Sequence, residues 1–206
     1  MTFSDTYIQN VSIARRTAAD AELTRQAILA AATRSFAEHG FAGTALEAVV
    51  AEAGITRGAL YHHFPDKVAL FQAVFVTVEE DFNNKVLEAV GAVDPEDHRG
   101  AVLAGFRAAI EAQQTPEYRQ IAIADAPAVL GHDQWHEVDA GIGMDSMRIG
   151  LELLRAGGHI AVEVNPALVT IMFGALTELG FAVSRGEIDT VDEALDGMTM
   201  LLDRLA

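Results

Sequence analysis

Apolar residues recur at steps of three and four along most of the chain, which is the spacing of one face of a helix. A first run of this kind covers 21–39 and ends at Gly40, and a second covers 44–53 and ends at Gly54. Glycine is common just past a helix end because it adopts a positive φ without strain. Thr44 is expected to cap the second helix. Alternating strand patterns are nearly absent, so the sequence predicts an all-α protein.

Two more helices are predicted directly after Gly54. Thr56 is expected to cap a short helix that ends near Phe64-Pro65, because proline cannot continue a helix. Asp66 is expected to cap a long helix after it. Two helices of about ten residues joined by a glycine-centred turn form a helix-turn-helix pattern, in which the second helix normally enters the DNA major groove.

The pattern divides the chain into three parts. Residues 1–18 are predicted to form a flexible tail, 19–66 a three-helix helix-turn-helix domain, and 67–206 a helical body. The last two predicted helices of the body follow Asn165 and Thr190 and carry apolar stripes with heptad-like spacing. Such stripes suit either an intermolecular four-helix bundle or packing within one chain. The stripe residues, which are the candidates for dimerisation, are Leu168, Met172, Ala175, Leu179, Val191, Leu195, Met198 and Leu202.

Charge is distributed unevenly over the 206 residues, whose formal net charge is -16. Residues 1–75 hold six Arg or Lys against seven Asp or Glu, whereas the remaining 131 residues hold eight against 23. An acidic body repels phosphate, so only the nearly neutral N-terminal part is suited to approach nucleic acid. The alternative is that the contrast is incidental in an acidic protein.

Composition also restricts the compartment and the chemistry. The chain has no cysteine, which excludes disulfides, thiolate metal sites and a cysteine nucleophile. No basic start followed by an apolar segment is present, so no cleaved signal peptide is expected, and the expected location is the cytoplasm. The apolar run 168–183 contains Glu178 and threonines, and we expect no membrane span there.

Groups that suit DNA cluster at the start of the third predicted helix. The first N–H groups of a helix have no partner within it and form its positive end. A glycine there lets the backbone approach DNA closely, an arginine reaches a guanine edge or a phosphate, and an alanine contacts a thymine methyl group. Tyrosine, histidine and lysine donate to phosphates. These candidates are Thr56, Arg57, Gly58, Ala59, Tyr61, His62 and Lys67.

The run from about Thr24 to Phe75 resembles the N-terminal DNA-binding domain of the tetracycline-repressor (TetR) family of transcriptional regulators. The resemblance rests on the segments ILAAATRSFAEHGF, TALEAVVAEAGI and TRGALYHHFPDKVALF. Glu47 and Glu52 depart from the family pattern, in which a basic residue is more often seen along the second helix. The positions that match common DNA contacts of the family are Thr24, Arg25, Thr44, Thr56, Arg57, Gly58, Tyr61, His62 and Lys67.

The resemblance implies a homodimer formed by the last two helices and a repressor that a small-molecule effector releases from a near-palindromic double-stranded DNA operator. It also implies an effector cavity in the body, with an aromatic and thioether lining and a partly apolar guest. Core packing is the alternative for each apolar candidate. With the polar candidates included, the expected ligand-binding residues are Phe82, Leu103, Phe106, Ile110, Asp125, His132, Trp135, His136, Met144, Met147 and Met172.

Two histidines leave another chemistry open. His132 and His136 are four residues apart, which places both imidazoles on one helical face, as in many metal sites. A third ligand is not specified, and no Glu follows the first His directly, as it does in metal hydrolases. No nucleophile elbow, phosphate loop or dinucleotide fingerprint is present, so we expect no enzyme activity, no cofactor and no metal. A ligand- or metal-binding sensor with little DNA affinity is the alternative to a regulator.

Overall fold

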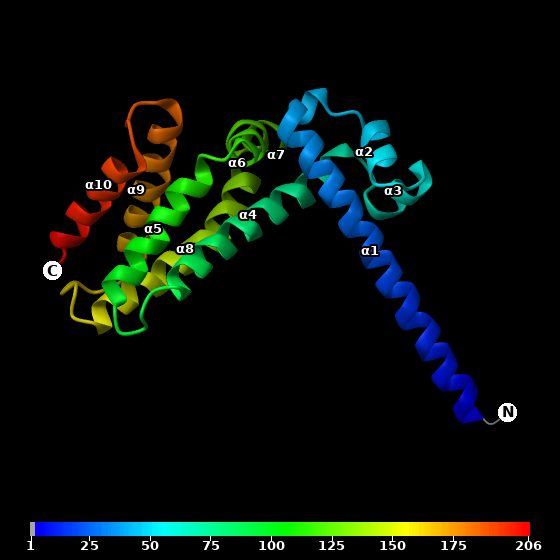
Figure 1. Cartoon of the computed structure of the whole chain (residues 1–206), viewed down its shortest axis with the longest axis horizontal. Helices are drawn as coiled ribbons and strands as arrows, with labels where there is room; N and C mark the ends of the chain where they lie inside the picture. Colours follow the sequence, from blue (N-terminus) through cyan, green and yellow to red (C-terminus); the bar gives the residue numbers. More distant parts are fainter. Residues whose placement is uncertain (1–2) are drawn as a thin grey trace. The chain divides into compact units, whose positions relative to one another are not determined.

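All regular secondary structure in the described part of the chain is helical (Figure 1). The computed structural model describes the backbone of residues 3–206 and the side chains of 19–141 and 143–206. The all-α prediction is therefore confirmed. The chain forms two compact units, one that ends at Val74 and one that begins at Phe75.

The first unit is a helix-turn-helix domain whose core is completed by the start of a longer helix. Its elements are α1 (Phe3–Gly43), α2 (Leu46–Glu52), α3 (Arg57–His63) and the first turns of α4 (Lys67–Gly91). Ile28, Phe36, Leu60 and Phe71 are fully buried. The rings of Phe36 and Phe71 meet edge to face with their centroids 5.1 Å apart, so α4 contributes directly to this core.

The helix α1 is longer than the sequence predicts. It begins at Phe3 and includes most of the segment 1–18, which was expected to form a flexible tail. Neither Gly nor Pro occurs between residues 3 and 39, so this segment contains no strong helix breaker. The predicted stop at Gly40 is confirmed, because this residue leaves the helical region with φ 68° and ψ 174°. Residues 1–2 lie outside the described residues.

The turn between α2 and α3 has the geometry that the sequence predicts. Gly54 has a φ of 66°. Thr56 Oγ1 accepts a hydrogen bond from the Ala59 N–H at 3.2 Å. At the start of α4, Asp66 Oδ1 accepts one from the Ala69 N–H at 2.8 Å. Both caps satisfy N–H groups that have no partner within their helix, and both predictions are confirmed.

The predicted cap of α2 is wrong. Ala45 is the N-cap residue of this helix, and its side chain forms no capping bond. Thr44 is buried, and its hydroxyl donates to the Gly40 carbonyl oxygen at 2.9 Å. The Ser35 hydroxyl donates to Thr44 Oγ1 at 3.3 Å. Thr44 therefore stabilises the kinked end of α1 instead of the start of α2.

The second unit is a bundle of helices that begins within α4. It continues with α5 (His98–Gln113), α6 (Pro116–Tyr118), the π-helix η1 (Arg119–Asp125), α7 (Ala126–Leu130), α8 (His132–Ala156), α9 (Pro166–Arg185) and α10 (Val191–Asp203). α5 packs against α8, α9 and α10. Side chains of Asp97, Asn165 and Thr190 cap α5, α9 and α10.

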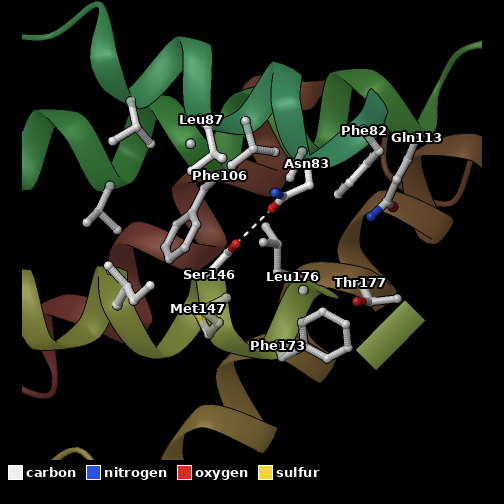
Figure 2. A pocket seen from close by; sticks show the side chains of 18 of the residues that line it. Phe82, Asn83, Leu87, Phe106, Gln113, Ser146, Met147, Phe173, Leu176 and Thr177 are labelled. Carbon is white, nitrogen blue, oxygen red and sulfur yellow. Dashed lines mark hydrogen bonds between the residues drawn. The ribbon is translucent and has the colours of Figure 1, made fainter. Parts of the chain in front are cut away.

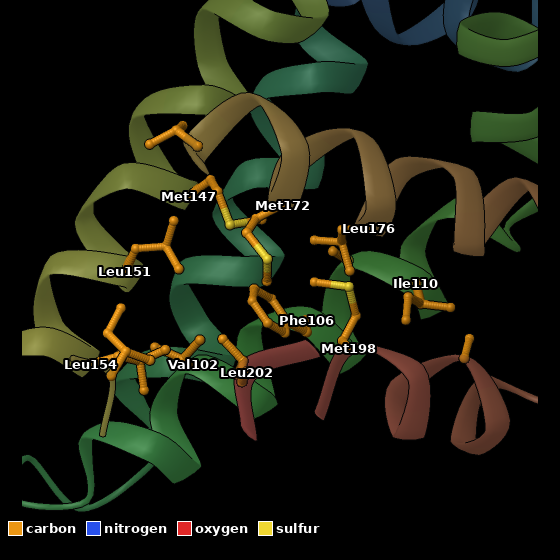
Figure 3. Close-up of a cluster of buried hydrophobic side chains, with 14 residues drawn as sticks. Val102, Phe106, Ile110, Met147, Leu151, Leu154, Met172, Leu176, Met198 and Leu202 are labelled. Atoms are coloured by element: carbon orange, nitrogen blue, oxygen red, sulfur yellow. The ribbon is translucent and has the colours of Figure 1, made fainter. Parts of the chain in front are cut away.

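The hydrophobic core of the second unit joins α5, α8, α9 and α10. Figure 3 shows Phe106 of α5 beside Met172 of α9 and beside Met198 and Leu202 of α10. Leu151 of α8 is fully buried in the same cluster. Thioether side chains are flexible and fill irregular spaces, which suits the junction of four helices.

The apolar stripes of α9 and α10 face this core, so three of the predicted dimerisation residues are covered within one chain, and the assignment of the other five stays a prediction. Met172, Met198 and Leu202 are buried within a single chain. The other members of the stripes are partly buried and pack against the same core; they are Leu168, Ala175, Leu179, Val191 and Leu195. Packing within one chain, the alternative interpretation of the stripes, is observed for the three buried residues. A helix in a bundle buries its most apolar face in the core of its own chain first.

In the described part of the chain, α9 is long and apolar enough to cross a membrane by length and composition alone. Core helices of bundles also meet these two criteria. Only 28% of its most apolar window is buried, so much of this apolar helix lies on the surface of the single chain. Ile171 on this surface is 63% exposed, and a Cβ added at Gly174 would meet nothing within 4 Å.

We expect Leu60→Ala to destabilise the first unit, because Leu60 is fully buried there. Truncation of a buried leucine lowers the free energy of unfolding by about 2–5 kcal/mol. Leu23→Ala is the matched control, since Leu23 is 64% exposed, and a change below about 0.5 kcal/mol is expected. Urea unfolding followed by circular dichroism measures both values. Equal effects of the two substitutions would contradict this assignment of the core.

Candidate functional site

The first candidate site is the outer face of the helix-turn-helix. Gly58 lies on open surface, since only the Thr56 side chain comes within 4 Å of a Cβ added there. The side chains predicted to contact DNA differ in exposure. The exposed positions are Thr56, Arg57, Gly58, Tyr61 and His62. The half-buried ones are Thr24, Arg25, Ala59 and Lys67. Thr44 is buried and bonded internally, so its side chain does not belong to this surface.

Arg57 links α2 and α3. Its Nη1 lies 3.1 Å from Glu47 Oε1, and its Nη2 donates to the Tyr61 hydroxyl at 3.4 Å. The guanidinium also lies 5.6 Å from the centre of the Tyr61 ring. Arg57 and Glu47 are both more than half exposed, and exposed ion pairs contribute only about 0–1 kcal/mol. The guanidinium is therefore held in a defined position at the surface but remains accessible.

Both acidic side chains of α2 have arginine partners. Glu47 pairs with Arg57, and Glu52 pairs with Arg34 of α1. These pairs cancel two negative charges that the sequence alone placed against DNA binding. The two carboxylates therefore repel an approaching phosphate less strongly.

Two further cations lie over aromatic rings at the edge of the same unit. Lys67 Nζ is 4.6 Å from the centre of the Phe41 ring, and Arg25 Cζ is 5.6 Å from the centre of the Phe64 ring. Cation–π contacts of this kind position a charged group without neutralising it. Both side chains thus remain suited to contact phosphate.

The second candidate site is a cavity of about 150 Å³ within the second unit. Figure 2 shows its wall, to which α4, α5, α8 and α9 contribute. The Ser146 hydroxyl of α8 donates to Asn83 Oδ1 of α4 at 2.8 Å. A Cβ at Gly143 would overlap the Phe173 ring, so this glycine gives the ring its place in the wall.

The structure places three of the predicted ligand-binding residues in the cavity wall: Phe82, Phe106 and Met147. The other predicted residues do not line it. Four of them belong to the hydrophobic core or pack against it: Leu103, Ile110, Met144 and Met172. The remaining four lie near the junctions of η1, α7 and α8: Asp125, His132, Trp135 and His136. A wall residue and a core residue share the same helical spacing, which is why the pattern did not separate them.

The histidines of α8 lie on its exposed first turns. The rings of His132 and His136 are nearly parallel, with centroids 5.9 Å apart. Between them in sequence, Trp135 points inward and its Nε1–H donates to the Ala122 carbonyl oxygen at 3.1 Å. Among the described side chains, no His, Asp or Glu joins the pair in a group of three.

Three polar residues of the cavity form an acidic cluster that the sequence analysis missed. Glu79 is only 2% exposed and accepts a hydrogen bond from the Tyr118 hydroxyl at 3.1 Å. Burial and, as the smaller cause, the Asp139 carboxyl raise the pKa of Glu79 to about 8, although the bond from Tyr118 acts to lower it. Burial raises the pKa of Asp139 to about 6, although the charge of His136 acts to lower it. Burial also raises the pKa of Tyr118 well above its usual value.

One more polar atom in the wall has no partner. Gln113 is 3% exposed, and its Oε1 accepts no hydrogen bond. A Cβ at Gly180 would overlap this amide, so Gln113 packs against the bare backbone of α9. Buried acceptors without a donor are rare in folded proteins and mark places where another molecule binds or where strain is stored.

The helical spacing of the sequence indicates inward positions for two of the acidic cluster residues, Glu79 and Asp139. Glu79 lies four residues after Phe75 and three before Phe82, so it occupies an inward position of α4. Asp139 lies eight residues before Met147, on the same face of α8. An acidic residue inside an apolar stripe is a signal that aromatic and methionine side chains alone do not give.

Family models match both units. The model for the tetracyclin repressor-like C-terminal domain matches residues 100–205, just over half of the chain, and the model for bacterial regulatory proteins of the tetR family matches residues 28–74. The chain belongs to the TetR family. The resemblance that the first unit shows in sequence is thereby confirmed and extends to the second unit of this TetR-family protein.

Individual relatives agree with this membership. The TetR-family chain is 33% identical over 111 residues to the HTH-type transcriptional regulator SrpR of Pseudomonas putida, which covers 54% of this chain and 51% of SrpR. It is 41% identical over 76 residues to the HTH-type transcriptional regulator AcrR of Shigella flexneri, covering 37% of this chain and 35% of AcrR. The matched region thus spans about half of the first relative and a third of the second.

A solved structure covers nearly the whole TetR-family chain. The crystal structure of a TetR-family transcriptional regulator from Pectobacterium atrosepticum has a TM-score of 0.76 and 30% sequence identity. The match covers 91% of this chain and 96% of the other. The predicted order of a helix-turn-helix domain and a helical second domain is therefore confirmed.

We expect Glu79→Gln to change how stability depends on pH in this TetR-family protein. The folded pKa of about 8 exceeds the ordinary value of 4.5, so the native state keeps a proton that the unfolded state releases between these values. The free energy of unfolding of the wild type therefore falls as the pH rises through this window, by at most about 1.4 kcal/mol per pH unit. The glutamine variant lacks this loss.

The measurement is urea unfolding at several pH values from about 5 to 8. The stability of Glu79→Gln relative to the wild type should increase steadily with pH. Glu80→Gln is the control, because Glu80 is the exposed neighbour on the same helix. Parallel curves for the wild type and Glu79→Gln would contradict a buried, protonated Glu79.

Proposed function

We propose that this chain is a DNA-binding transcriptional regulator, most simply a repressor, whose operator affinity is set by a small molecule in the cavity of its second unit. The observation that carries the proposal is the exposed face of α3, capped by Thr56 and preceded by the Gly54 turn. The pairing of Glu47 and Glu52 with arginines supports it, because it reduces the charge that opposes DNA. The printed names of its relatives, transcriptional regulators, agree.

In this proposal α3 is the recognition helix and lies in the major groove. Arg57 reads a guanine edge or contacts a phosphate, with Tyr61 holding the guanidinium. Gly58 lets the backbone approach the DNA closely. Lys67 and Arg25 contact phosphates, which fix the position of the domain but carry no sequence information.

We propose a homodimer formed by the outward faces of α9 and α10. This proposal rests on the apolar surface that these helices keep after the core of one chain is formed. Ile171 is 63% exposed and Met200 is 59% exposed. Gly174, with open space around it, permits close approach of a second helix. A twofold dimer presents two α3 helices to half-sites about 34–36 Å apart or a multiple of this distance, so its operator is near-palindromic.

The effector acts through linkage in this proposal. Residues Leu70 and Phe71 of α4 are buried in the first unit, and Glu79 and Phe82 of the same helix line the cavity. A ligand that favours one position of the later turns of α4 thereby favours one position of the DNA-binding domain. The coupling free energy of such systems is about 1–3 kcal/mol, and the effect is reciprocal. A chromosomal operator as partner implies a cytoplasmic location.

Selection from a pool of random DNA duplexes with the full chain tests the function. We expect enrichment of a near-palindromic sequence and an affinity that falls steeply with salt, because bound phosphates release counterions. Failure to enrich any sequence at low salt would contradict the proposal and favour the alternative, a sensor with little DNA affinity.

We expect Lys67→Ala to weaken binding to the selected duplex and to unrelated duplexes by the same factor. A lost phosphate contact also lowers the slope of log affinity against log salt by about 1. Lys85→Ala is the matched control, since Lys85 is the other lysine of the chain and lies exposed on α4 in the second unit. Fluorescence anisotropy at several salt concentrations measures both. A Lys67→Ala variant with wild-type affinity and slope would remove Lys67 from the DNA surface.

We expect Ile171→Glu to break the dimer, because a charge at the centre of an apolar interface loses its water without gaining a partner. Sedimentation velocity measures the effect. The wild type should sediment as a dimer of the 22.0 kDa chain, and the variant should associate at least about tenfold more weakly. Val162→Glu, at an exposed valine in the segment before α9, serves as control. A variant that stays dimeric would show that another face forms the interface.

A further inference from the structure

The cavity wall is apolar except for a few groups, and the charged ones are all acidic. Glu79 of α4 and Asp139 of α8 are its ionisable carboxyl groups, and Tyr118 completes the cluster. None of the described residues that line the cavity is Lys, Arg or His. Two carboxyl groups thus share an apolar space in which the protein supplies no cation.

The hydrogen bonds of the cluster would leave an ionised Glu79 largely uncompensated. The Tyr118 hydroxyl donates to both carboxylate oxygens of Glu79, at 3.1 and 3.4 Å. One neutral donor offsets only a small part of the cost of burying a carboxylate. The positive charge that favours the ionised form of Asp139 is that of His136, which lies on the exposed side of α8.

Gln113 belongs to the same wall. Its buried Oε1 lies against the backbone of α9 at Gly180 and accepts no hydrogen bond. Figure 2 shows Gln113 beside Phe82, with the hydrogen-bonded pair Asn83 and Ser146 farther along the cavity.

From the acidic cluster and the aromatic rings of the cavity wall we infer that the effector of the proposed regulator is a small organic cation with an apolar body. This inference names the ligand class for the site of the proposed function and rests on it. The apolar body contacts Phe82, Phe106 and Phe173, whose faces carry partial negative charge and also attract cations. The charged head lies near Glu79 and Asp139 and supplies the missing counter-ion.

Binding of a cation must change the protonation of the cluster. The groups that face Glu79 are Tyr118 and Asp139, and the charge that acts on Asp139 is that of His136. A cation favours ionised carboxyl groups, so Glu79 loses its proton when the ligand binds near neutral pH. Since the pKa of Glu79 is about 8 in the free protein, affinity for a permanent cation should rise with pH below this value and binding should release protons.

Three probes of one shape separate the possible ligand classes. Phenyltrimethylammonium is a permanent cation, tert-butylbenzene is its uncharged counterpart, and benzenesulfonate is an anion with a tetrahedral head. Calorimetry with the full chain at pH 6 and pH 8 should show the cation binding tightest, with an affinity at least about tenfold higher at pH 8. Two buffers of different ionisation enthalpy measure the protons released.

Substitutions test whether the acidic cluster is responsible. Glu79→Gln and Asp139→Asn should each weaken phenyltrimethylammonium at least about tenfold and leave tert-butylbenzene unchanged or tighter. Glu80→Gln, on the exposed side of α4, should leave the affinity of all three probes at the wild-type value. Tighter binding of the neutral or anionic probe, equal binding of the cation by Glu79→Gln, or no binding of the cation at all would each overturn the inference.

A DNA-binding measurement on the unliganded protein separates this inference from the proposed function. If the chain selects a DNA sequence but fails to bind the cation, only the ligand class is wrong. If it binds the cation with proton release but selects no DNA, the regulator proposal is wrong and the ligand site stands as that of a sensor.

Discussion

The continuity of α4 is the constraint on which both units depend. Its first turns complete the core of the helix-turn-helix domain through Leu70 and Phe71, and its later turns carry Glu79 and Phe82 into the cavity wall. One helix therefore has to satisfy two packing problems at once, without a Gly or Pro between Lys67 and Lys85 to uncouple them. A helix that contributes to two cores is the kind of connection through which two sites can bias each other.

The helix-turn-helix surface shows how a strongly acidic chain keeps a face suited to DNA. The acidic residues of α2 are each bonded to an arginine, and the cations that lie over aromatic rings keep their charge. The pair between Glu47 and Arg57 is exposed and therefore weak, so a guanine edge or a phosphate can replace the carboxylate.

Local features of the fold were predictable from the sequence, whereas the partners of each helix face were not. Gly54, Thr56 and Asp66 act within one turn of chain, and their roles follow from residue type alone. The prediction that Thr44 caps α2 was wrong because two roles of threonine look alike in sequence. One is to cap a helix, and the other is to donate to the carbonyl oxygen four residues earlier. The stripe containing Met172 and Met198 was recognised correctly as apolar, but periodicity does not say which surface covers it.

The candidate cavity shows the same limit. Phe82, Phe106 and Met147 line it, whereas Ile110 and Met172 belong to the core, and a void between helices has no signature in the spacing of the residues around it. Glu79 indicates the cavity more strongly than the apolar residues do, because a carboxyl group on an inward-facing position is rarely explained by core packing.

Burial of Glu79 also has a thermodynamic consequence for regulation. Near neutral pH the free protein holds this carboxyl largely protonated, which costs stability relative to an ionised group in water. A ligand that supplies positive charge removes that cost and binds only the folded cavity, so it stabilises the second unit by mass action. The cost of the buried carboxyl in the free state thus increases the free-energy difference between the free and liganded forms. A ligand needs a large free-energy difference of this kind to shift a two-state equilibrium. An apolar residue at position 79 would stabilise the free protein, but the cavity would then lose the carboxyl through which a charged ligand distinguishes the two forms.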